Sequence, residues 1–332
     1  MGGSVAAGAS GRSRKDGFWI TAIGLVLLAA VTGIAVIVTA KGPSSDNPFA
    51  GETLYASPQS SAATAAKLAN GTADSAPLSA LARVPAAVWL LPEEHPTGEV
   101  TEFVTRLEAD AAFRSQLPVL VVYGIPTRDC GNFSAGGTEA ADYPGWVSAI
   151  ARGIASSKTV VILEPDALAL APSCGTEEAT TSLLKKAVTV LSDNPRTTVY
   201  LDGGHSHWLP AEEMAPLLTA AGVEQVRGFA TNVSNYNTTD DERAYGEKLS
   251  KLLGGAHFVV DTSRNGSGST GEWCNPPGRT VGLTPSGVDD GTAQDANLWV
   301  KNPGESDGEC NGGPPAGQWW PSRAREFARS IS

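Results

Sequence analysis

The sequence predicts an α/β protein built on a parallel sheet, arranged either as an α/β barrel or as a doubly wound sheet. Seven short apolar runs are continuous rather than alternating, which is typical of strands that are covered on both faces. Stretches rich in alanine and leucine separate the runs, and strand–helix alternation of this length is typical of those two architectures. Acidic residues follow the runs, at the edge where both architectures place their functional sites.

The expected strands are short, and each ends in a polar turn. In chain order they are AAVWLL from Ala86, PVLVVYGIP from Pro118, TVVILEPD from Thr159, TTVYLDGG from Thr197, VRGFATNVS from Val226, AHFVVDTSRNG from Ala256 and NLWVKNPGESDG from Asn297. The expected helices between them include GEVTEFVTRLEADAAFRSQ at 98–116, YPGWVSAIARGIASS at 143–157 and EEATTSLLKKAVTVLSD at 177–193. This alternation is the basis of the α/β prediction.

Aspartates follow the strands in series, at Asp129, Asp166, Asp202, Asp261 and Asp307. A single aspartate after a strand is most often a helix N-cap or part of an Asx-turn. Several tryptophans lie in or near the same run ends, namely Trp89, Trp208, Trp273, Trp299, Trp319 and Trp320. Five carboxylates together with indole faces indicate a site that binds sugars.

Other functional classes lack their sequence signals. The formal net charge of -11 comes without a basic stripe, which argues against a nucleic-acid partner. Neither a phosphate-binding loop nor a dinucleotide-binding fingerprint is present, and GHSHW at Gly204 has Trp208 where a nucleophile elbow needs glycine. His205 and His207 have no evident third ligand, so we expect neither a metal nor another cofactor.

Residues 18–40, FWITAIGLVLLAAVTGIAVIVTA, carry no charge and exceed the roughly 20 apolar residues that cross a bilayer. Arg12, Arg14 and Lys15 precede this segment. The positive-inside tendency therefore keeps the basic tail, residues 1–17, in the cytoplasm and sends the rest of the chain across the membrane. We expect a transmembrane anchor here, and membrane association through it.

Cleavage of the same segment is the alternative, because Val38 and Ala40 fit the small-residue pattern of a signal peptidase site. Residues 41–46 are predicted to be a short linker. The main domain, residues 47–332, is then extracytoplasmic, either membrane-anchored or secreted after cleavage.

The cysteine count agrees with export. Cys130, Cys174, Cys274 and Cys310 form an even set without the CxxC spacing of a zinc site. In an oxidising compartment such a set predicts two disulfides, for which three pairings are possible.

Eight motifs together resemble family 6 of the glycoside hydrolases, the inverting cellulases. They are NPFAGETLY at Asn47, RDCGNFSAGG at Arg128, LEPDAL at Leu163, YLDGGHSHW at Tyr200, GFATNVSNYN at Gly228, DTSRNGSG at Asp261, WCNPPGR at Trp273 and LWVKNPGESDG at Leu298. They follow the family's order, so the resemblance covers residues 47–332 as one catalytic domain. It implies a distorted barrel of parallel strands, with fewer than eight strands, and a groove that binds β-1,4-glucan.

The resemblance also implies catalytic roles. Asp166 matches the general acid, and Asp129 matches the carboxylate that tunes the acid and positions water. Asp307 matches the position proposed as the base, and Tyr123 matches the tyrosine over the scissile sugar. Inversion needs an acid on one side of the bond and water on the other, and a second carboxylate nearby raises the acid's pKa by like-charge repulsion.

The sugar-binding residues are likewise implied by the resemblance. Trp89, Trp208 and Trp273 match sugar platforms, Lys301 and Glu305 match a hydroxyl-binding pair, Asp202 matches a supporting or sugar-binding aspartate, and His205, Asn232 and Asn235 are weaker matches. One departure concerns the serine that helps to hold water in some members, which aligns with Ala135 better than with Ser134. Backbone carbonyls are the alternative holders of that water.

The order of the motifs implies that Cys130 pairs with Cys174 and Cys274 with Cys310. The interval between Cys274 and Cys310 is short, whereas processive members of the family roof the groove there with a long loop. We therefore expect a monomeric endo-β-1,4-glucanase with an open cleft. The alternatives are a processive cellobiohydrolase of the same family and a glucan-binding protein that has lost activity.

Overall fold

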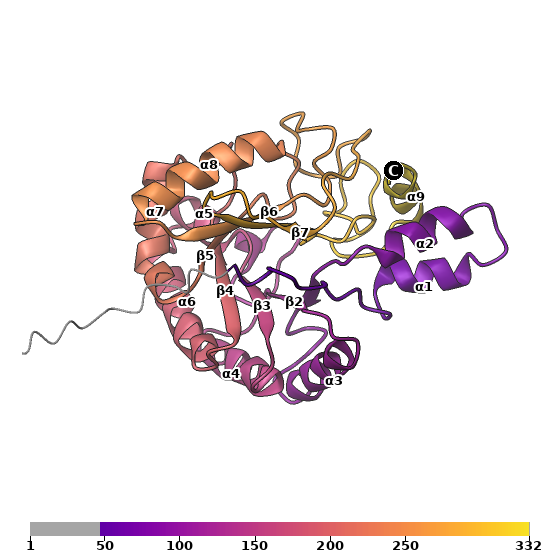
Figure 1. The fold of residues 1–332 in the computed structure, drawn as a ribbon. Coiled ribbons are helices and arrows are strands. Elements are labelled where there is room, and N and C mark those ends of the chain that lie inside the picture. Colours follow the sequence, from indigo (N-terminus) through magenta and orange to yellow (C-terminus); the bar gives the residue numbers. More distant parts are fainter. Residues whose placement is uncertain (1–46, 332) are drawn as a thin grey trace, which may run out of the picture. The chain divides into compact units, whose positions relative to one another are not determined.

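A curved, mostly parallel sheet forms the centre of the fold, and helices cover its outer face (Figure 1). The computed structural model describes residues 47–331. The eight strands have the order β1-β2-β3-β4-β5-β6-β8-β7. Their bounds are β1 Val88–Leu90, β2 Val119–Val122, β3 Thr159–Leu163, β4 Thr197–Asp202, β5 Gly228–Thr231, β6 His257–Asp261, β7 Ser286–Gly287 and β8 Gln294–Leu298.

The predicted distorted parallel barrel is confirmed. Every neighbouring pair from β1 through to β8 is parallel, and only the two-residue β7 is antiparallel to β8. Fewer than eight strands are thus parallel, as expected. The curved sheet returns toward its first strand, where the Ala87 N–H donates to the Trp299 carbonyl at 2.9 Å.

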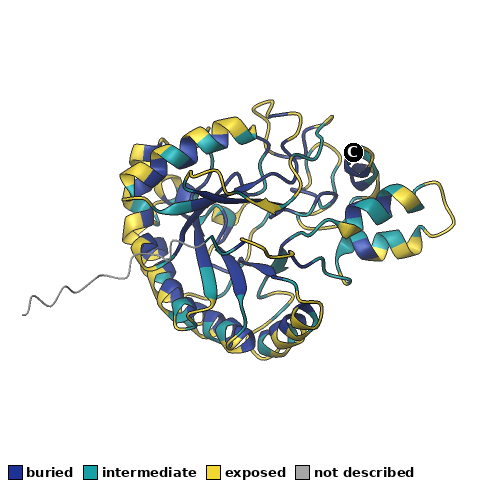
Figure 2. Cartoon of the chain, in the orientation of Figure 1, coloured by how far each residue is buried: buried dark blue, intermediate teal, exposed yellow. Residues whose placement is uncertain are grey.

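Helices α3, α4, α6, α7 and α8 lie in an arc outside the strands and show their exposed faces to the solvent, whereas α1, α2 and α9 form a separate group (Figure 1 and Figure 2). Their bounds are α1 Ser61–Leu68, α2 Ser75–Arg83, α3 Val100–Phe113, α4 Tyr143–Ile154, α5 Ala167–Cys174, α6 Glu177–Ser192, α7 Ala211–Ala220, α8 Thr239–Leu252 and α9 Pro321–Arg329. The three helices expected from the sequence correspond to α3, α4 and α6, with small differences at their ends.

Two apolar layers hold the sheet in place, because successive side chains on a strand face opposite sides. Val121, Ile162 and Tyr200 belong to the layer inside the barrel. Leu120 and Val161 belong to the larger layer between strands and helices. Burial on both faces explains why these strands appear in the sequence as continuous apolar runs.

The last parallel strand differs from its prediction. The apolar run was expected to begin at Asn297, whereas β8 begins at Gln294. Its early residues are polar but buried: Asp295 forms an ion pair with Arg227 at 2.8 Å and accepts a hydrogen bond from the Tyr200 hydroxyl at 2.6 Å. Because these contacts are distant in sequence, hydrophobicity alone does not indicate them.

The predicted N-terminal tail, membrane segment and linker, residues 1–17, 18–40 and 41–46, lie outside the described residues. Within residues 47–331, no helix has both the length and the apolar character needed to span a membrane.

Candidate active site

A large cavity of about 1080 Å³ opens at the carboxyl ends of the strands. All four predicted catalytic residues and most of the predicted sugar-binding residues line it: Tyr123, Asp129, Asp166, Asp307, Trp89, His205, Trp208, Asn235, Trp273, Lys301 and Glu305. This volume is at the upper end of the roughly 300–1,000 Å³ of ordinary small-molecule pockets, and both indole and carboxylate side chains line its walls. The cavity is therefore suited to a long polar ligand.

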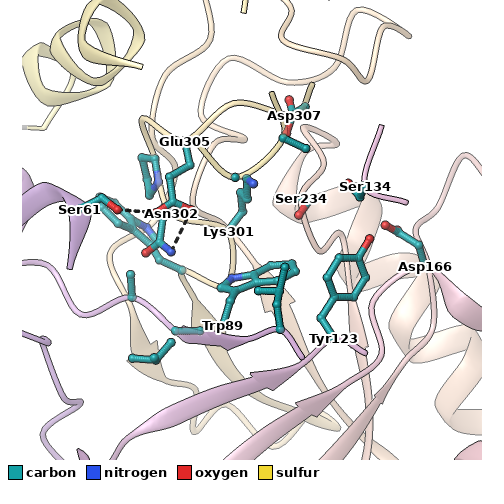
Figure 3. A pocket seen from close by; sticks show the side chains of 18 of the residues that line it. Ser61, Trp89, Tyr123, Ser134, Asp166, Ser234, Lys301, Asn302, Glu305 and Asp307 are labelled. Carbon is teal, nitrogen blue, oxygen red and sulfur yellow. Dashed lines mark hydrogen bonds between the residues drawn. The ribbon is translucent and has the colours of Figure 1, made fainter. Parts of the chain in front are cut away.

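Asp166 lies just beyond β3, at the start of α5. Its backbone has a left-handed φ of 68°, and Glu164 two residues earlier has a φ of 50°. Such conformations cost about 1–3 kcal/mol each and cluster at functional sites. The Asp166 carboxyl does not cap α5, so the N-cap explanation for this residue does not hold. Instead, the side chain points toward the cavity beside Tyr123 (Figure 3).

The electrostatic surroundings of Asp166 favour its protonated form. Protein atoms surround the carboxyl on most sides, although it keeps some exposure to the cavity. This burial, together with the negative charges of Asp129 and Asp307, raises the pKa of Asp166 to about 7, and Lys301 opposes the rise. A carboxyl with such a pKa still holds a proton near neutral pH, as a general acid requires.

Asp129 begins the loop that follows β2. Its Oδ2 accepts a hydrogen bond from the Ser134 N–H at 2.8 Å, and burial raises the pKa of its carboxyl. The next residue, Cys130, forms a disulfide with Cys174, the last residue of α5. Since α5 begins directly after Asp166, this disulfide links the two segments that carry these acids.

Asp307 is held by donors on both oxygens. Its Oδ1 accepts from the Arg264 guanidinium at 2.8 Å, while Oδ2 accepts from the Tyr236 hydroxyl at 2.9 Å and the Asn275 N–H at 3.0 Å.

Asn275 follows Cys274, which forms the second disulfide with Cys310. Both predicted pairings are therefore confirmed.

The part of the cavity near Trp89 carries polar groups that suit sugar hydroxyls (Figure 3). The Lys301 ammonium lies 5.6 Å from the centre of the Trp89 ring, and burial lowers its pKa. Glu305 accepts hydrogen bonds from the Ser61 hydroxyl at 2.9 Å and from the Asn302 amide at 3.3 Å. The Tyr123 ring meets Trp89 edge-on, with 5.2 Å between ring centroids.

At another part of the cavity, His205 and Trp208 pack together with ring centroids 5.3 Å apart. Burial and the neighbouring His207 lower the pKa of His205 to about 4, so its ring is neutral near neutral pH. Asn235 lines the cavity as well. Within residues 47–331, no cluster of three histidine, cysteine or acidic side chains is arranged to hold a metal ion.

Two predicted sugar-binding residues do not line the cavity. Asp202 is buried below it, where Oδ1 accepts the N–H groups of Asp166 and Gly204, both at 3.0 Å. Asn232 is fully buried and bonds to the backbone of Asn237 and Asp261. In this structure both residues support the loops of the site from below, and neither is placed to contact a sugar.

The sequence prediction missed several residues that shape the site. Arg264 is almost fully buried and pairs with Asp307, and Tyr236 packs against its guanidinium at 4.4 Å. Arg128 stacks on Tyr123 at 4.6 Å and donates to the Ser134 carbonyl, so it braces the Asp129 loop. An arginine close to an aspartate in each of the motifs RDCGNFSAGG and DTSRNGSG was the available signal. Ser134 and Ala135, the two candidates for the water-holding position, both line the cavity.

Comparisons with known proteins agree with this geometry. The family model described as "Glycosyl hydrolases family 6" matches residues 49–330. Endoglucanase A of Cellulomonas fimi is 46% identical over 84% of this chain, which spans only 61% of that relative. Endoglucanase 1 of Streptomyces halstedii is 38% identical over 90% of this chain and 96% of its own length.

A solved structure, the endoglucanase Cel6 from Mycobacterium tuberculosis in complex with a thio-linked cellobioside, has the same fold. Its TM-score is 0.82 at 43% identity, and the match covers 86% of this chain and 99% of that one. The earlier resemblance and the predicted class of enzyme, a glycoside hydrolase of the cellulase family, are confirmed. The chain belongs to family 6 of the glycosyl hydrolases.

Proposed function

We propose that the chain hydrolyses β-1,4-glucan with inversion of the anomeric configuration, acting as an endoglucanase. The observation that carries this proposal is that Asp166, whose pKa is raised to about 7 by burial and by the charges of Asp129 and Asp307, shares one large cavity with these two aspartates. Asp166 donates its proton to the glycosidic oxygen as the bond to the leaving sugar breaks. Water attacks the anomeric carbon from the opposite face, so the product forms in the α configuration.

The attacking water must lose a proton to a group on its own side of the sugar. Asp129 suits this task better than Asp307, because fewer protein donors engage its carboxylate. Asp307 accepts hydrogen bonds from Arg264, Tyr236 and Asn275. Its contribution is therefore to hold these loops together and to place a negative charge near Asp166. In this proposal Asp129, which the resemblance gives the task of positioning the water, also takes its proton, and Asp307 remains the alternative base.

An endo mode of action has two supports. Relatives named endoglucanase match this chain at 38–46% identity, whereas those named cellobiohydrolase match at 32–33%. The Cys274–Cys310 disulfide joins residues only 36 positions apart, which leaves little chain to roof the groove. An open groove admits a glucan in the middle of the chain.

Soluble carboxymethyl cellulose tests both the activity and its mode. We expect reducing ends to appear, and the viscosity to fall early relative to the number of ends formed. A slow fall in viscosity with cellobiose as the main early product would favour the processive alternative. Binding without any release of reducing sugar would support the inactive glucan-binding protein and refute the proposal.

We also infer an extracytoplasmic location, because the two disulfides are of a kind that persists in oxidising compartments. Residues 18–40 then serve as an uncleaved anchor or as a signal that is removed. Cell fractionation with N-terminal sequencing distinguishes these outcomes. Full-length chain in the membrane fraction supports the anchor, a secreted chain that begins at Lys41 supports cleavage, and accumulation in the cytosol refutes both.

A further inference from the structure

Phe133 and Trp273 form an exposed aromatic pair at the rim of the cavity. Their ring centroids are 5.9 Å apart with 53° between the planes, and the residues are 48% and 51% exposed. The other large aromatic side chain exposed to this degree in the part of the chain that the structure describes is Phe113. Two contacting aromatic rings left in water on the rim of a binding groove indicate a binding surface.

Phe133 belongs to the loop that carries Asp129 and packs against the loop that carries Asp307. It directly precedes Ser134, whose N–H donates to the Asp129 carboxylate at 2.8 Å. Its Cβ also packs closely over Gly308, where an added Cβ would lie only 2.7 Å from it. This contact, together with the disulfides Cys130–Cys174 and Cys274–Cys310, holds the base of the aromatic pair in place.

The ring of Phe133 is not packed as part of the core. It lines the main cavity and also a second cavity of about 290 Å³, which it shares with Asn132, Glu309, Pro315 and Ala316. Open space on two sides leaves the ring free to contact a ligand. The tilt and short distance between the two rings exclude a sugar between them, so together they form a continuous angled surface.

The position of the pair indicates which part of a glucan it meets. Trp89 and Tyr123 are in contact, and the hydroxyl-binding groups Lys301 and Glu305 lie beyond Tyr123 on the Trp89 side (Figure 3). Ser134 and Asp166 lie next to Tyr123, on the side away from Lys301 and Glu305 (Figure 3). If the scissile sugar lies at Tyr123, as the proposed function requires, the Phe133 side of the cavity receives the leaving part of the chain.

We propose that Phe133 extends the Trp273 surface into a binding site for the leaving-group portion of the glucan, and so determines specificity for substrates that carry sugars there. This inference rests on the proposed function. A flat apolar ring beside an indole matches the apolar faces of glucosyl units, and burial of the exposed ring area favours binding.

The test compares two substrates that share the cellobiosyl unit but differ in the leaving group. Cellotetraose leaves a cellobiose that reaches Phe133, whereas β-cellobiosyl fluoride leaves only fluoride. We expect Phe133→Ala to lower kcat/KM for cellotetraose by about tenfold, or ~1.4 kcal/mol, and to leave the fluoride substrate unchanged. Phe133→Leu, which keeps bulk over Gly308 but no aromatic face, should resemble Phe133→Ala, and Phe133→Tyr should retain activity.

Phe113→Ala provides the matched control, because it removes an exposed phenyl ring from α3 outside the cavity. Equal losses of kcat/KM on both substrates would show that Phe133 only holds the Asp129 loop. An unchanged kcat/KM on cellotetraose would show that Phe133 does not bind the leaving part of the glucan. Both results overturn the inference. If the wild type hydrolyses neither substrate, the proposed function fails independently of this inference. Titration with cellohexaose then tests the binding site alone. Weaker binding by Phe133→Ala than by the wild type supports the site, and equal binding overturns it.

Discussion

Arg264 and Asp307 form a buried ion pair, with 2.8 Å between the guanidinium Nη1 and the carboxylate Oδ1. The side chains are only 1% and 5% exposed. Removing one partner of such a pair leaves an uncompensated charge in a poorly solvated place. The pair therefore makes the loop that carries Asp307 depend on Arg264, a residue that the sequence prediction did not assign to the site.

We expect Arg264→Met to lower the free energy of unfolding by about 3–5 kcal/mol, because it leaves the buried Asp307 carboxylate without its cation. Urea denaturation followed by circular dichroism measures the change. Arg243→Met is the matched control, since the Arg243–Asp290 pair is about 40% exposed and should contribute less than about 1 kcal/mol.

Equal costs for the two arginine variants would contradict this view of the Arg264–Asp307 pair. A second outcome bears on the catalytic role of Asp307. If azide restores turnover to Asp307→Ala by replacing the attacking water, Asp307 acts directly as the base. We expect no such rescue, because the carboxylate is already engaged by its donors.

Asp129→Asn is expected to lower activity strongly, because it removes the proposed base, and to move the alkaline limb of the remaining activity to lower pH. In the proposed mechanism Asp166 must be protonated to act, so activity should fall as the pH rises through its pKa of about 7. Burial is the largest cause of the raised pKa of Asp166, and the negative charge of Asp129 is the next largest. Removal of that charge therefore lowers the pKa of Asp166 but leaves it above the usual value of an aspartate. The measurement is kcat/KM on a soluble cello-oligosaccharide as a function of pH. An alkaline limb that stays in place or moves upward would refute the coupling.

Removal of the Cys130–Cys174 disulfide by a double serine substitution is expected to cost both stability and activity. The disulfide joins residues 44 positions apart, for which the chain-entropy model gives about 4 kcal/mol, and typical losses are about 2–4 kcal/mol. Because the bridge links the Asp129 loop to α5, turnover should also fall at temperatures where the variant is fully folded. Thermal unfolding and kcat measured together test this, and unchanged turnover in the folded variant would limit the disulfide to a structural role.

Asp166→Asn is expected to keep substrate binding while turnover on cellulose falls by about 100 to 10,000-fold, the usual contribution of general acid catalysis. The amide has nearly the shape of the acid but cannot donate the proton. An aryl glycoside with a good leaving group needs little protonation, so its hydrolysis should fall much less. Binding by titration and turnover on both substrates check this. If Asp166→Asn keeps most of its activity on cellulose, Asp166 is not the general acid.

The sequence predicted the strands well wherever both of their faces are covered by apolar layers. It failed at β8, because Asp295 is compensated by Arg227 and Tyr200, which are far away along the chain. Hydrophobicity identifies burial only when the buried side chain is apolar, and a buried ion pair requires knowledge of the partner's position.

The sequence also showed where the aspartates lie along the chain but not which way they point. Asp202 and Asp261 are the last residues of β4 and β6, and they share the inward alternation of Tyr200 and Val259. Both therefore lie inside the barrel below the cavity, where they accept backbone N–H groups. Asp129, Asp166 and Asp307 come after strand ends, on loops that leave the strand alternation, and these three reach the cavity.

The stereochemistry of the first product tests the central claim most directly. Proton NMR of cello-oligosaccharide hydrolysis, recorded before mutarotation equilibrates the anomers, distinguishes the two mechanisms. A single displacement by water on a β-linked chain, with Asp166 as the acid, predicts that the α-anomer appears first. An initial β-anomer would indicate a double displacement and would contradict the inverting mechanism.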